Sequence, residues 1–364
     1  MKKTRITFFI LFLISVLLYF LTDSDFAFYF MIFAAVYTLI ALLIVKASGR
    51  NLTFSLEGAS QGMKGEPVNL KMVMDNRSLL PILCCRVRIK TENILLGTEE
   101  VQELVTSMWP IEKKITNLDI TENHIGCVRI SVESAELRDS IGLFRKDCLN
   151  TASAEYLIFP QMSELQISRE MFLSYDMESY KYSKTKKGAD LSEVFDVREY
   201  MPGDSIKAIH WKLSAKTDSM MIKVPSLPVE NSLMIILDNN LNGFDSEADR
   251  GDKIEELVNM FMSVSYTLIK QGLQHSMGWY DLNDENYEHH NIRHNDDLYN
   301  TAALVVKSPF GEDKICAAER LLNADFDKPY AAYIYVTHSG EAEKEVERLR
   351  EYGEVYIYRP DNYK

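Results

Sequence analysis

At 364 residues, the chain is long enough for about two soluble domains beside a membrane anchor. Its formal net charge of -13 excludes a broad basic face, so no nucleic-acid partner is expected. The composition, with 46% apolar and 26% charged residues, is that of an ordinary globular protein. The five cysteines show no C-x-x-C spacing, which predicts free thiols in a reducing compartment. They are Cys84, Cys85, Cys127, Cys148 and Cys316.

Two apolar runs open the chain, at residues 6–21 and 26–45. Each is close to the roughly 20 residues that span a bilayer core. The polar segment between them, residues 22–25, is long enough only for a tight turn. The sequence therefore predicts a transmembrane hairpin of two antiparallel helices within residues 1–50.

Positive charge flanks this hairpin on one side only. Lys2, Lys3 and Arg5 precede the first run, Lys46 and Arg50 follow the second, and the turn carries only acids. By the positive-inside rule, we expect a multi-pass protein of the cell membrane with its N- and C-termini in the cytoplasm. A cleaved signal peptide is the competing interpretation, but a second full-length run follows at once and no A-x-A-like cleavage site lies between the runs.

Residues 51–150 change to short alternating segments, as at 52–56, 68–74 and 85–89, separated by turn residues. Alternation with a period of two is typical of strands, and several short strands predict a β-sandwich. We find no metal, nucleophile or phosphate motif here, so the domain is expected to act either as a spacer or as a protein-binding module. Residues 139–144 are interpreted as a strand-turn signature and not as a site.

Residues 151–230 are predicted to form a linker and a motif-bearing segment. Within it, residues 179–188 carry four lysines, two tyrosines and no acid, which favours a solvated loop over a mobile linker, a lipid contact or a partner contact. Further on, Pro202 and Gly203 form a turn dipeptide, and Asp204 or Ser205 can accept N–H bonds at the start of a short helix. Trp211 is expected to pack or to form a lid. The predicted apolar face of the helix comprises Ile206, Ile209 and Leu213.

This run resembles the signature of the family catalogued as domain of unknown function 58, in outline R-x-Y-x-P-G-D-x-x-R-x-I-x-W-x-x-S-A. The matching residues are Arg198, Tyr200, Pro202, Gly203, Asp204, Ile209, Trp211, Ser214 and Ala215. Lys207 replaces the arginine after the turn, which keeps the charge and loses the planar fork suited to bidentate pairing. The layout of the whole chain is also similar to that of the family.

The resemblance implies a non-enzymatic, membrane-anchored scaffold or assembly factor. Its implied partners are a MoxR-type AAA+ ATPase and a transglutaminase-like membrane protein. On this interpretation the motif is an interface or an interdomain hinge, formed by Arg198, Tyr200, Pro202, Gly203, Asp204, Lys207 and Trp211. Two alternatives stay open: Arg198, Asp204 and Trp211 only pin the turn, or Asp204, His210 and nearby lysines line an enzyme's cleft.

Residues 231–364 predict an α/β domain with a doubly wound sheet, which resembles the von Willebrand factor A domains. The predicted strands lie at 232–237, 275–281, 331–336 and 355–358, and the predicted helices at 249–271, 312–323 and 340–351. Ligands of such sheets bind at the carboxyl ends of the strands, which directs attention to the residues that follow position 237.

Asp238, Asn240 and Asn242 resemble the D-x-S-x-S metal motif of von Willebrand factor A domains, with asparagines in place of the serines. Oxygen ligands suit Mg²⁺ or Ca²⁺, so a divalent-cation-dependent binding module is the second hypothesis. Against it, the chain offers Thr337, His338 and Ser339 where that motif needs a later Asp, and Asp238 would then only cap its loop.

Other catalytic and metal signatures are missing from the sequence. We find no phosphate-binding glycine loop, no G-x-G-x-x-G, no G-x-S-x-G and no H-E-x-x-H. His289, His290 and His294 suggest a transition-metal site, but no third ligand has proper spacing and the segment is expected to be a loop. The common catalytic signatures are thus absent, but an enzyme whose carboxylates are brought together by folding would leave no local trace. The non-enzymatic interpretation rests on the resemblance, and the only cofactor considered is Mg²⁺ or Ca²⁺.

Overall fold

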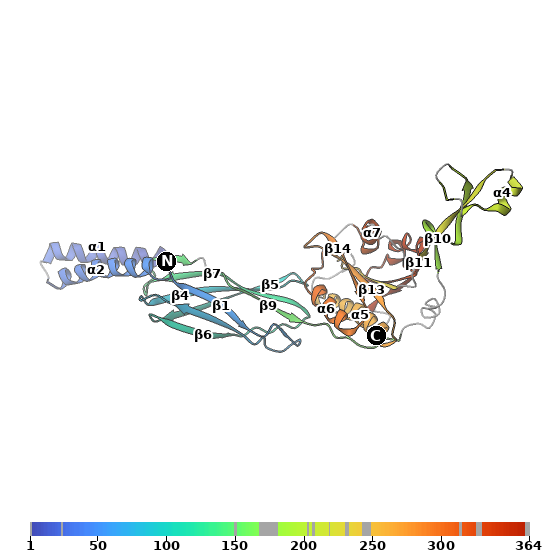
Figure 1. Ribbon diagram of the computed structural model, residues 1–364. Helices are drawn as coiled ribbons and strands as arrows, with labels where there is room; N and C mark the ends of the chain where they lie inside the picture. Colours follow the sequence, from blue (N-terminus) through green and yellow to red (C-terminus); the bar gives the residue numbers. More distant parts are fainter. Residues whose placement is uncertain are drawn as a thin grey trace. The chain divides into compact units, whose positions relative to one another are not determined.

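The computed structural model in Figure 1 describes most of the chain. The described residues are 2–22, 25–148, 151–166, 181–201, 204–205, 208–217, 219–229, 233–241, 249–312, 315–324 and 330–360. The chain divides into two compact units, Met1–Ile158 and Phe159–Lys364, and each is described by itself.

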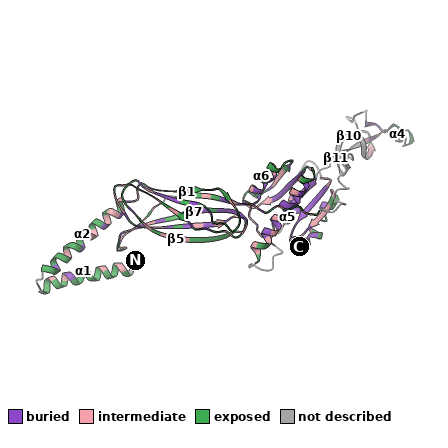
Figure 2. Ribbon diagram, turned by 90° about the horizontal axis from the view of Figure 1, so that it is seen from below, coloured by how far each residue is buried: buried purple, intermediate pink, exposed green. Residues whose placement is uncertain are grey.

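The first unit begins with two long helices, α1 (Lys2–Thr22) and α2 (Asp25–Ala47), which pack against each other. Both are long and apolar enough to cross a membrane. Three of the buried side chains of α2 are alanines that recur every seven residues along one stripe, which lets the helices approach closely. They are Ala27, Ala34 and Ala41. Most of the larger apolar side chains point outward instead, as the exposed colouring in Figure 2 shows.

Two sheets follow in the same unit. The first has the order β1 (Leu52–Gly58), β3 (Leu70–Asn76) and β6 (Glu112–Leu118). The second has the order β2 (Gln61–Gly62), β9 (Ser153–Ile158), β7 (Gly126–Arg138), β4 (Ile82–Asn93) and β5 (Thr98–Met108), and β8 (Arg145–Cys148) also pairs with β7. All pairs are antiparallel except that of β2 with β9.

Alternate residues of these strands form the core. Leu52 and Phe54 of β1, Met72 of β3, and Val87 and Ile89 of β4 are all buried. Their spacing of two is the pattern from which the strands were predicted, because successive side chains of a strand point to opposite faces. The predicted strand segments therefore correspond to β1, β3 and β4.

The loop between β7 and β8 joins the domain to the hairpin. The buried carboxylate of Asp139 accepts hydrogen bonds from the amides of Ile141 (3.1 Å) and Phe144 (2.7 Å), and this fixes the loop. From α2, the hydroxyl of Tyr37 donates to Asp139 (3.2 Å). From α1, Nε of Arg5 donates to the carbonyl of Leu143 (2.7 Å). The segment predicted as a simple strand-turn signature thus contacts both helices.

Lys146, on β8, adds a further link to α2. Its Nζ donates to the carbonyls of Lys46 (2.9 Å) and Ser48 (2.7 Å) at the end of that helix. A cation here satisfies carbonyls that have no partner within the helix, and it interacts favourably with the helix dipole. The apolar hairpin is therefore attached to the domain by directional polar bonds and not only by its short connection.

The first strands of the second unit are β10 (Lys181–Glu199) and β11 (Met221–Val229), which pair antiparallel with several register shifts. Between them lies the short helix α4 (Trp211–Thr217). The prediction of a solvated loop at 179–188 was wrong for its described residues, 181–188, since they belong to β10. The sequence window held no sign of the partner strand, about 40 residues away, that supplies the backbone hydrogen bonds.

A five-stranded sheet forms the rest of this unit, in the order β14 (Asn286–Ile292), β13 (His275–Asp281), β12 (Leu233–Leu237), β15 (Ala332–Val336) and β16 (Glu354–Tyr358). Neighbouring strands are parallel except that β14 is antiparallel to β13. Every residue of β12 and β15 is buried, as expected for central parallel strands.

Helices accompany this sheet. Along the chain they are α5 (Arg250–Lys270), α6 (Asn295–Val305), α7 (Ala317–Asn323), α8 (Ala342–Glu345) and a 3₁₀ turn at Leu349–Glu351. Met234 and Ile236 of β12 pack in one cluster with residues of α7 and α8. The intervening residues of β12 point to the opposite face of the sheet. The helix predicted at 312–323 is shorter than expected, and the one at 340–351 is broken into two pieces.

Candidate functional site

The motif-bearing turn is held by an ion pair between Arg198, near the end of β10, and Asp204. Nη1 and Nη2 of the arginine lie 2.8 and 2.7 Å from the two carboxylate oxygens, so the pairing is bidentate. The amide of Met201 also donates to Asp204 (2.8 Å). These bonds lower the pKa of Asp204, with the Arg198 hydrogen bond as the largest cause and the Met201 amide next.

Backbone and hydroxyl bonds tie the turn to β11. The amide of Tyr200 donates to the carbonyl of Met220 (2.8 Å), and that of His210 to the carbonyl of Met221 (2.8 Å). Ser214 accepts from the amide of Met221 (2.9 Å) and donates to the carbonyl of His210 (3.1 Å). The matching serine of the motif therefore fastens α4 to the neighbouring strand.

Three large apolar side chains stand exposed around this fastened turn. Trp211 is 65% exposed, Met201 63% and Met220 55%. The expectation that Trp211 packs or forms a lid is thus wrong: it begins α4 and points to solvent. We call Met201, Trp211 and Met220 the apolar tip. Pro202, Gly203, Ile206 and Lys207 lie outside the described residues.

Asp204 and His210, the residues that the enzyme alternative assigns to a cleft, both make hydrogen bonds within this turn. Both oxygens of Asp204 pair with Arg198, and the lowered pKa makes the carboxylate a weak base. Nδ1 of His210 accepts from the amide of Leu213 at 3.3 Å, in the first turn of α4. In this arrangement the two side chains position the backbone.

The second candidate site lies where β12 and β15 end side by side. The next strand along the chain, β13, pairs with β12 on one side, and the later strand β15 pairs with it on the other side. The strand order therefore reverses at β12, which makes this a switch point of the sheet. Asp238 follows β12 and is only 3% exposed. The hydroxyl of Thr337, which follows β15, donates to its Oδ2 (2.7 Å). Its Oδ1 is buried and makes no hydrogen bond within the described part of the chain.

Burial raises the pKa of Asp238 to about 6. The hydrogen bond from Thr337 opposes this rise, and the negative charge of Glu345 adds to it. The hydroxyl of Tyr335 and the amide of Ala317 also lie close enough to lower the pKa, although neither bonds to Oδ1. The carboxyl group is therefore poised between its charged and neutral forms at about pH 6.

The proposed metal ligands are only partly brought together. Asp238 and Asn240 line one cavity of about 10 Å³, which is close to the space of a single water molecule. Asn242 lies outside the described residues. The free oxygen of Asp238 fits a cation, whereas Arg320 lines the same cavity and its guanidinium opposes one. No group of three or more His, Cys, Asp or Glu side chains that could hold a metal ion occurs in the described ranges.

The three histidines also take separate roles. His289 and His290 lie on β14, a strand and not the loop that was predicted, and consecutive strand residues face opposite sides. Nε2 of His289 bonds to the hydroxyl of Tyr330, while His290 stacks on Trp279 and bonds to Glu288 (3.1 Å). His294 precedes α6. This separation argues against a shared metal site.

Part of the chain is similar to a known protein family. Residues 196–289, from the end of β10 into β14, match the family model described as Protein of unknown function DUF58. This range contains the Arg198–Asp204 pair, the apolar tip and Asp238. The comparison with curated proteins finds no match.

Three solved structures show a weak likeness. A crystal structure of the CARDB domain of a Pyrococcus furiosus protein, in complex with di-metal ions, is 17% identical with a TM-score of 0.24, and the match covers 30% of this chain and 92% of that one. A solution structure of the same domain is 19% identical with a TM-score of 0.23, covering 30% and 94%. The alkylpurine DNA glycosylase AlkC of Pseudomonas fluorescens, bound to DNA with an abasic site analogue, is 14% identical with a TM-score of 0.21, covering 35% and 38%.

The ion pair predicts a measurable change in backbone protection. We expect Asp204→Asn to speed amide hydrogen exchange across residues 199–213, because the bidentate pair and the Met201 bond are both weakened. Glu199→Gln, at an exposed neighbouring acid, is the control and should leave exchange unchanged. Since the pKa of Asp204 is lowered, the wild-type protection should persist at neutral pH and fade only as the pH falls below about 4. Equal exchange in both variants would contradict this role.

Asp238 predicts a pH dependence of opposite sign. Its pKa is raised, so the folded state binds more protons than the unfolded state between about pH 4 and 6, and stability should fall as the pH rises through that window. The loss should approach about 3 kcal/mol above pH 6. Asp238→Asn should flatten this dependence, whereas Glu351→Gln, at an exposed acid, should not. Urea unfolding at several pH values, followed by the fluorescence of buried Trp279, measures it. An unchanged profile in Asp238→Asn would disprove the assignment.

Proposed function

We propose that this protein is a non-enzymatic scaffold or assembly factor that is anchored in the cell membrane and binds a protein partner through the apolar tip. The partner that the family resemblance favours is a MoxR-type AAA+ ATPase, with a transglutaminase-like membrane protein as a further member of the assembly. The observation that carries the proposal is the exposure of Trp211, Met201 and Met220 on a turn that bidentate pairing holds in place.

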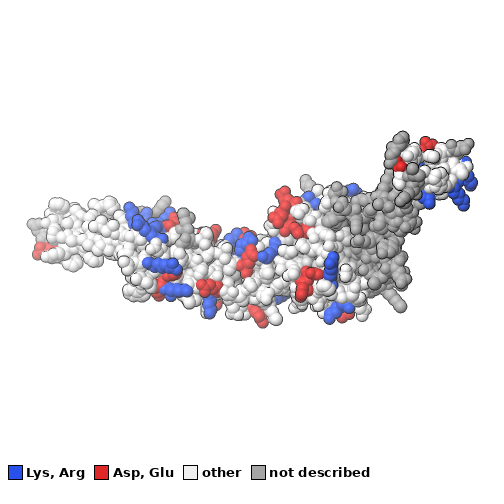
Figure 3. Space-filling view, viewed as in Figure 1, with Lys and Arg blue, Asp and Glu red and all other residues white. Residues whose placement is uncertain are grey.

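The anchoring is supported by the surface of the hairpin. In Figure 3 the two helices are almost free of charge along their length, and charged residues gather at the hairpin's ends. Lys3, Arg5 and Lys46 mark the end next to the domain, whereas Asp25 begins α2 at the turn. This asymmetry favours an orientation with both termini in the cytoplasm.

The finer fold classes belong to the same proposal. We assign the two sheets of the first unit to a β-sandwich, because both bury alternate residues. For the second unit, the antiparallel edge strand and the order β14-β13-β12-β15-β16 support a doubly wound, von Willebrand factor A-like domain. Both classes commonly present loops to protein partners on a rigid framework.

The chemistry of the tip suits a protein interface. Trp is a frequent interface hot spot, and Met is enriched at interfaces and adapts its shape to a partner. The exposed Lys212 and Lys216 on α4 add positive charge beside this apolar surface, and Figure 3 shows Lys and Arg gathered there. We therefore infer a partner with an apolar pocket rimmed by acidic side chains, because charge complementarity directs association.

A divalent cation is the second candidate, and one observation favours it. Oδ1 of Asp238 is a buried carboxylate oxygen without a hydrogen-bond donor in the described part of the structure. Mg²⁺ or Ca²⁺ would satisfy it, with Asn240 and Asn242 as the further oxygen ligands. Arg320 in the same cavity opposes such an ion, so we rank this candidate below the scaffold.

Affinity capture of the intact, detergent-solubilised protein tests the proposal. Trp211→Ala should weaken capture of the ATPase roughly 30-fold, as expected for a hot spot worth about 2 kcal/mol. Trp109→Ala is a matched control, since Trp109 is 74% exposed but lies in the β domain. If a chelator and Asp238→Asn release the partner while Trp211→Ala does not, the cation candidate replaces the tip. Equal capture by wild type and all variants would reject both.

A further inference from the structure

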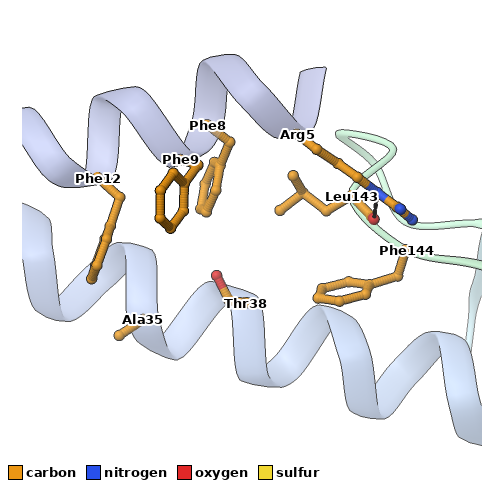
Figure 4. A pocket seen from close by; sticks show the side chains of 8 residues that line it. All are labelled: Arg5, Phe8, Phe9, Phe12, Ala35, Thr38, Leu143 and Phe144. Carbon is orange, nitrogen blue, oxygen red and sulfur yellow. Dashed lines mark hydrogen bonds between the residues drawn. The ribbon is translucent and has the colours of Figure 1, made fainter. Parts of the chain in front are cut away.

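A cavity of about 630 Å³ lies between the helical hairpin and the β7–β8 loop, all within the first unit. Figure 4 shows its lining: Phe8, Phe9 and Phe12 of α1 point toward α2, and Leu143 and Phe144 of the loop close one end. Phe9 is 63% exposed, so the cavity is open along the side of the hairpin. A volume of this size suits a small molecule or an acyl chain and is too small for a further helix.

One cation stands at the end of this apolar cavity. Arg5 lies one residue before the apolar run of α1, and its Nε donates to the carbonyl of Leu143 (2.7 Å), which holds the guanidinium in place. Its two terminal nitrogens make no bond to the described residues, and no carboxylate there pairs with it. A guanidinium fixed on one edge and open on the other can donate two parallel bonds to a phosphate.

The depth of the cavity matches a lipid lying along the hairpin. Phe12 follows Arg5 by seven residues, which is about 10 Å along a helix. If the hairpin crosses the bilayer as proposed above, Arg5 lies at the level of the headgroups and Phe12 lies in the hydrocarbon core. The polar and apolar ends of the cavity then follow the polar and apolar parts of a phospholipid.

We propose that this cavity is a binding site for an anionic glycerophospholipid of the cytoplasmic leaflet. The phosphate pairs with Arg5, and one acyl chain lies against Phe8, Phe9 and Phe12. The unpaired positive charge favours an anionic headgroup over a zwitterionic one, whose ammonium finds no carboxylate at the cavity among the described residues. Because Leu143 and Phe144 line the cavity, the bound lipid also contacts the loop that fastens the β domain to the hairpin. This inference rests on the proposed membrane anchoring.

Photocrosslinking in vesicles tests the site. The full-length protein is reconstituted in phosphatidylcholine vesicles that contain a photoactivatable acyl-chain probe of either phosphatidylglycerol or phosphatidylcholine, and labelled peptides are mapped. We expect the phosphatidylglycerol probe to label the peptides that contain Phe8–Phe12 and Leu143–Phe144. Arg5→Gln should reduce this labelling about fivefold or more, since one interfacial cation contributes about that factor. Lys3→Gln, at a basic residue outside the cavity, should change it much less.

A second variant keeps the test valid if Arg5→Gln disturbs the loop. Ala35, on the α2 side of the cavity, can be enlarged with Arg5 left in place. Ala35→Trp should fill the space and abolish labelling of the same peptides. Equal labelling by both probes, or labelling unchanged in both Arg5→Gln and Ala35→Trp, would overturn the proposal. Loss of the labelling in millimolar inorganic phosphate would mean that the site binds free anions and not a lipid.

Flotation of the same vesicles separates the two proposals. A protein that fails to float with the vesicles, or that alkaline carbonate extracts, would contradict the membrane anchoring itself. A protein that floats and resists extraction but shows no preference for the anionic probe would leave the anchoring intact and reject the lipid site alone.

Discussion

The apolar surface of the N-terminal hairpin is the constraint on which the rest of the structure depends. Twenty of the exposed large apolar side chains among the described residues belong to α1 and α2. Removing one such side chain from water stabilises a protein by about 1.5–3 kcal/mol. Burial of the whole surface would therefore contribute tens of kcal/mol of stabilising free energy, which the chain does not gain by its own folding. On the proposed anchoring, a bilayer supplies the missing apolar surroundings, and the domain that follows is fastened to a membrane-embedded hairpin.

Charged side chains hold the backbone in position both at the helical hairpin and at the motif-bearing turn. At the hairpin, Arg5 and Lys146 donate to carbonyls and so bind α1 and α2 to the β domain. At the motif, Arg198 and Asp204 hold the turn that presents the apolar tip. In both places a charged side chain holds the backbone in position, and apolar side chains are exposed beside it. This shared arrangement supports both proposals, the binding of a lipid at the hairpin and of a protein partner at the apolar tip.

Much of the fold could be predicted from the sequence, because periodicity reports burial. The two apolar runs became α1 and α2, and the strands β12, β13, β15 and β16 lie where apolar runs indicated them. Two of the misses come from strand pairing that a polar sequence does not reveal. The polar segment β14 is a strand because its neighbour β13 pairs with it at the sheet edge, and residues 181–188 are a strand because the more distant β11 pairs with them.

The sequence predicted the candidate sites only in part, because some of the residues that meet there are far apart in the chain. The motif marked Arg198, Asp204 and Trp211, but nothing local indicated that Trp211 would be exposed or that Met220 would stand beside it. The loop at 139–144 resembled an ordinary turn, since its contacts with Arg5 and Tyr37 join residues more than 100 positions apart. Asp238 was recognised from the strand that precedes it, whereas its partner Thr337 is 99 residues away and follows from the sheet order.

Cysteine labelling of the membrane topology tests the central claim most directly, with Ser24→Cys and Lys364→Cys placed singly in a cysteine-free chain. We predict that a membrane-impermeant maleimide labels position 24 in intact cells and position 364 only after the membrane is opened. Labelling of position 364 in intact cells would contradict the account.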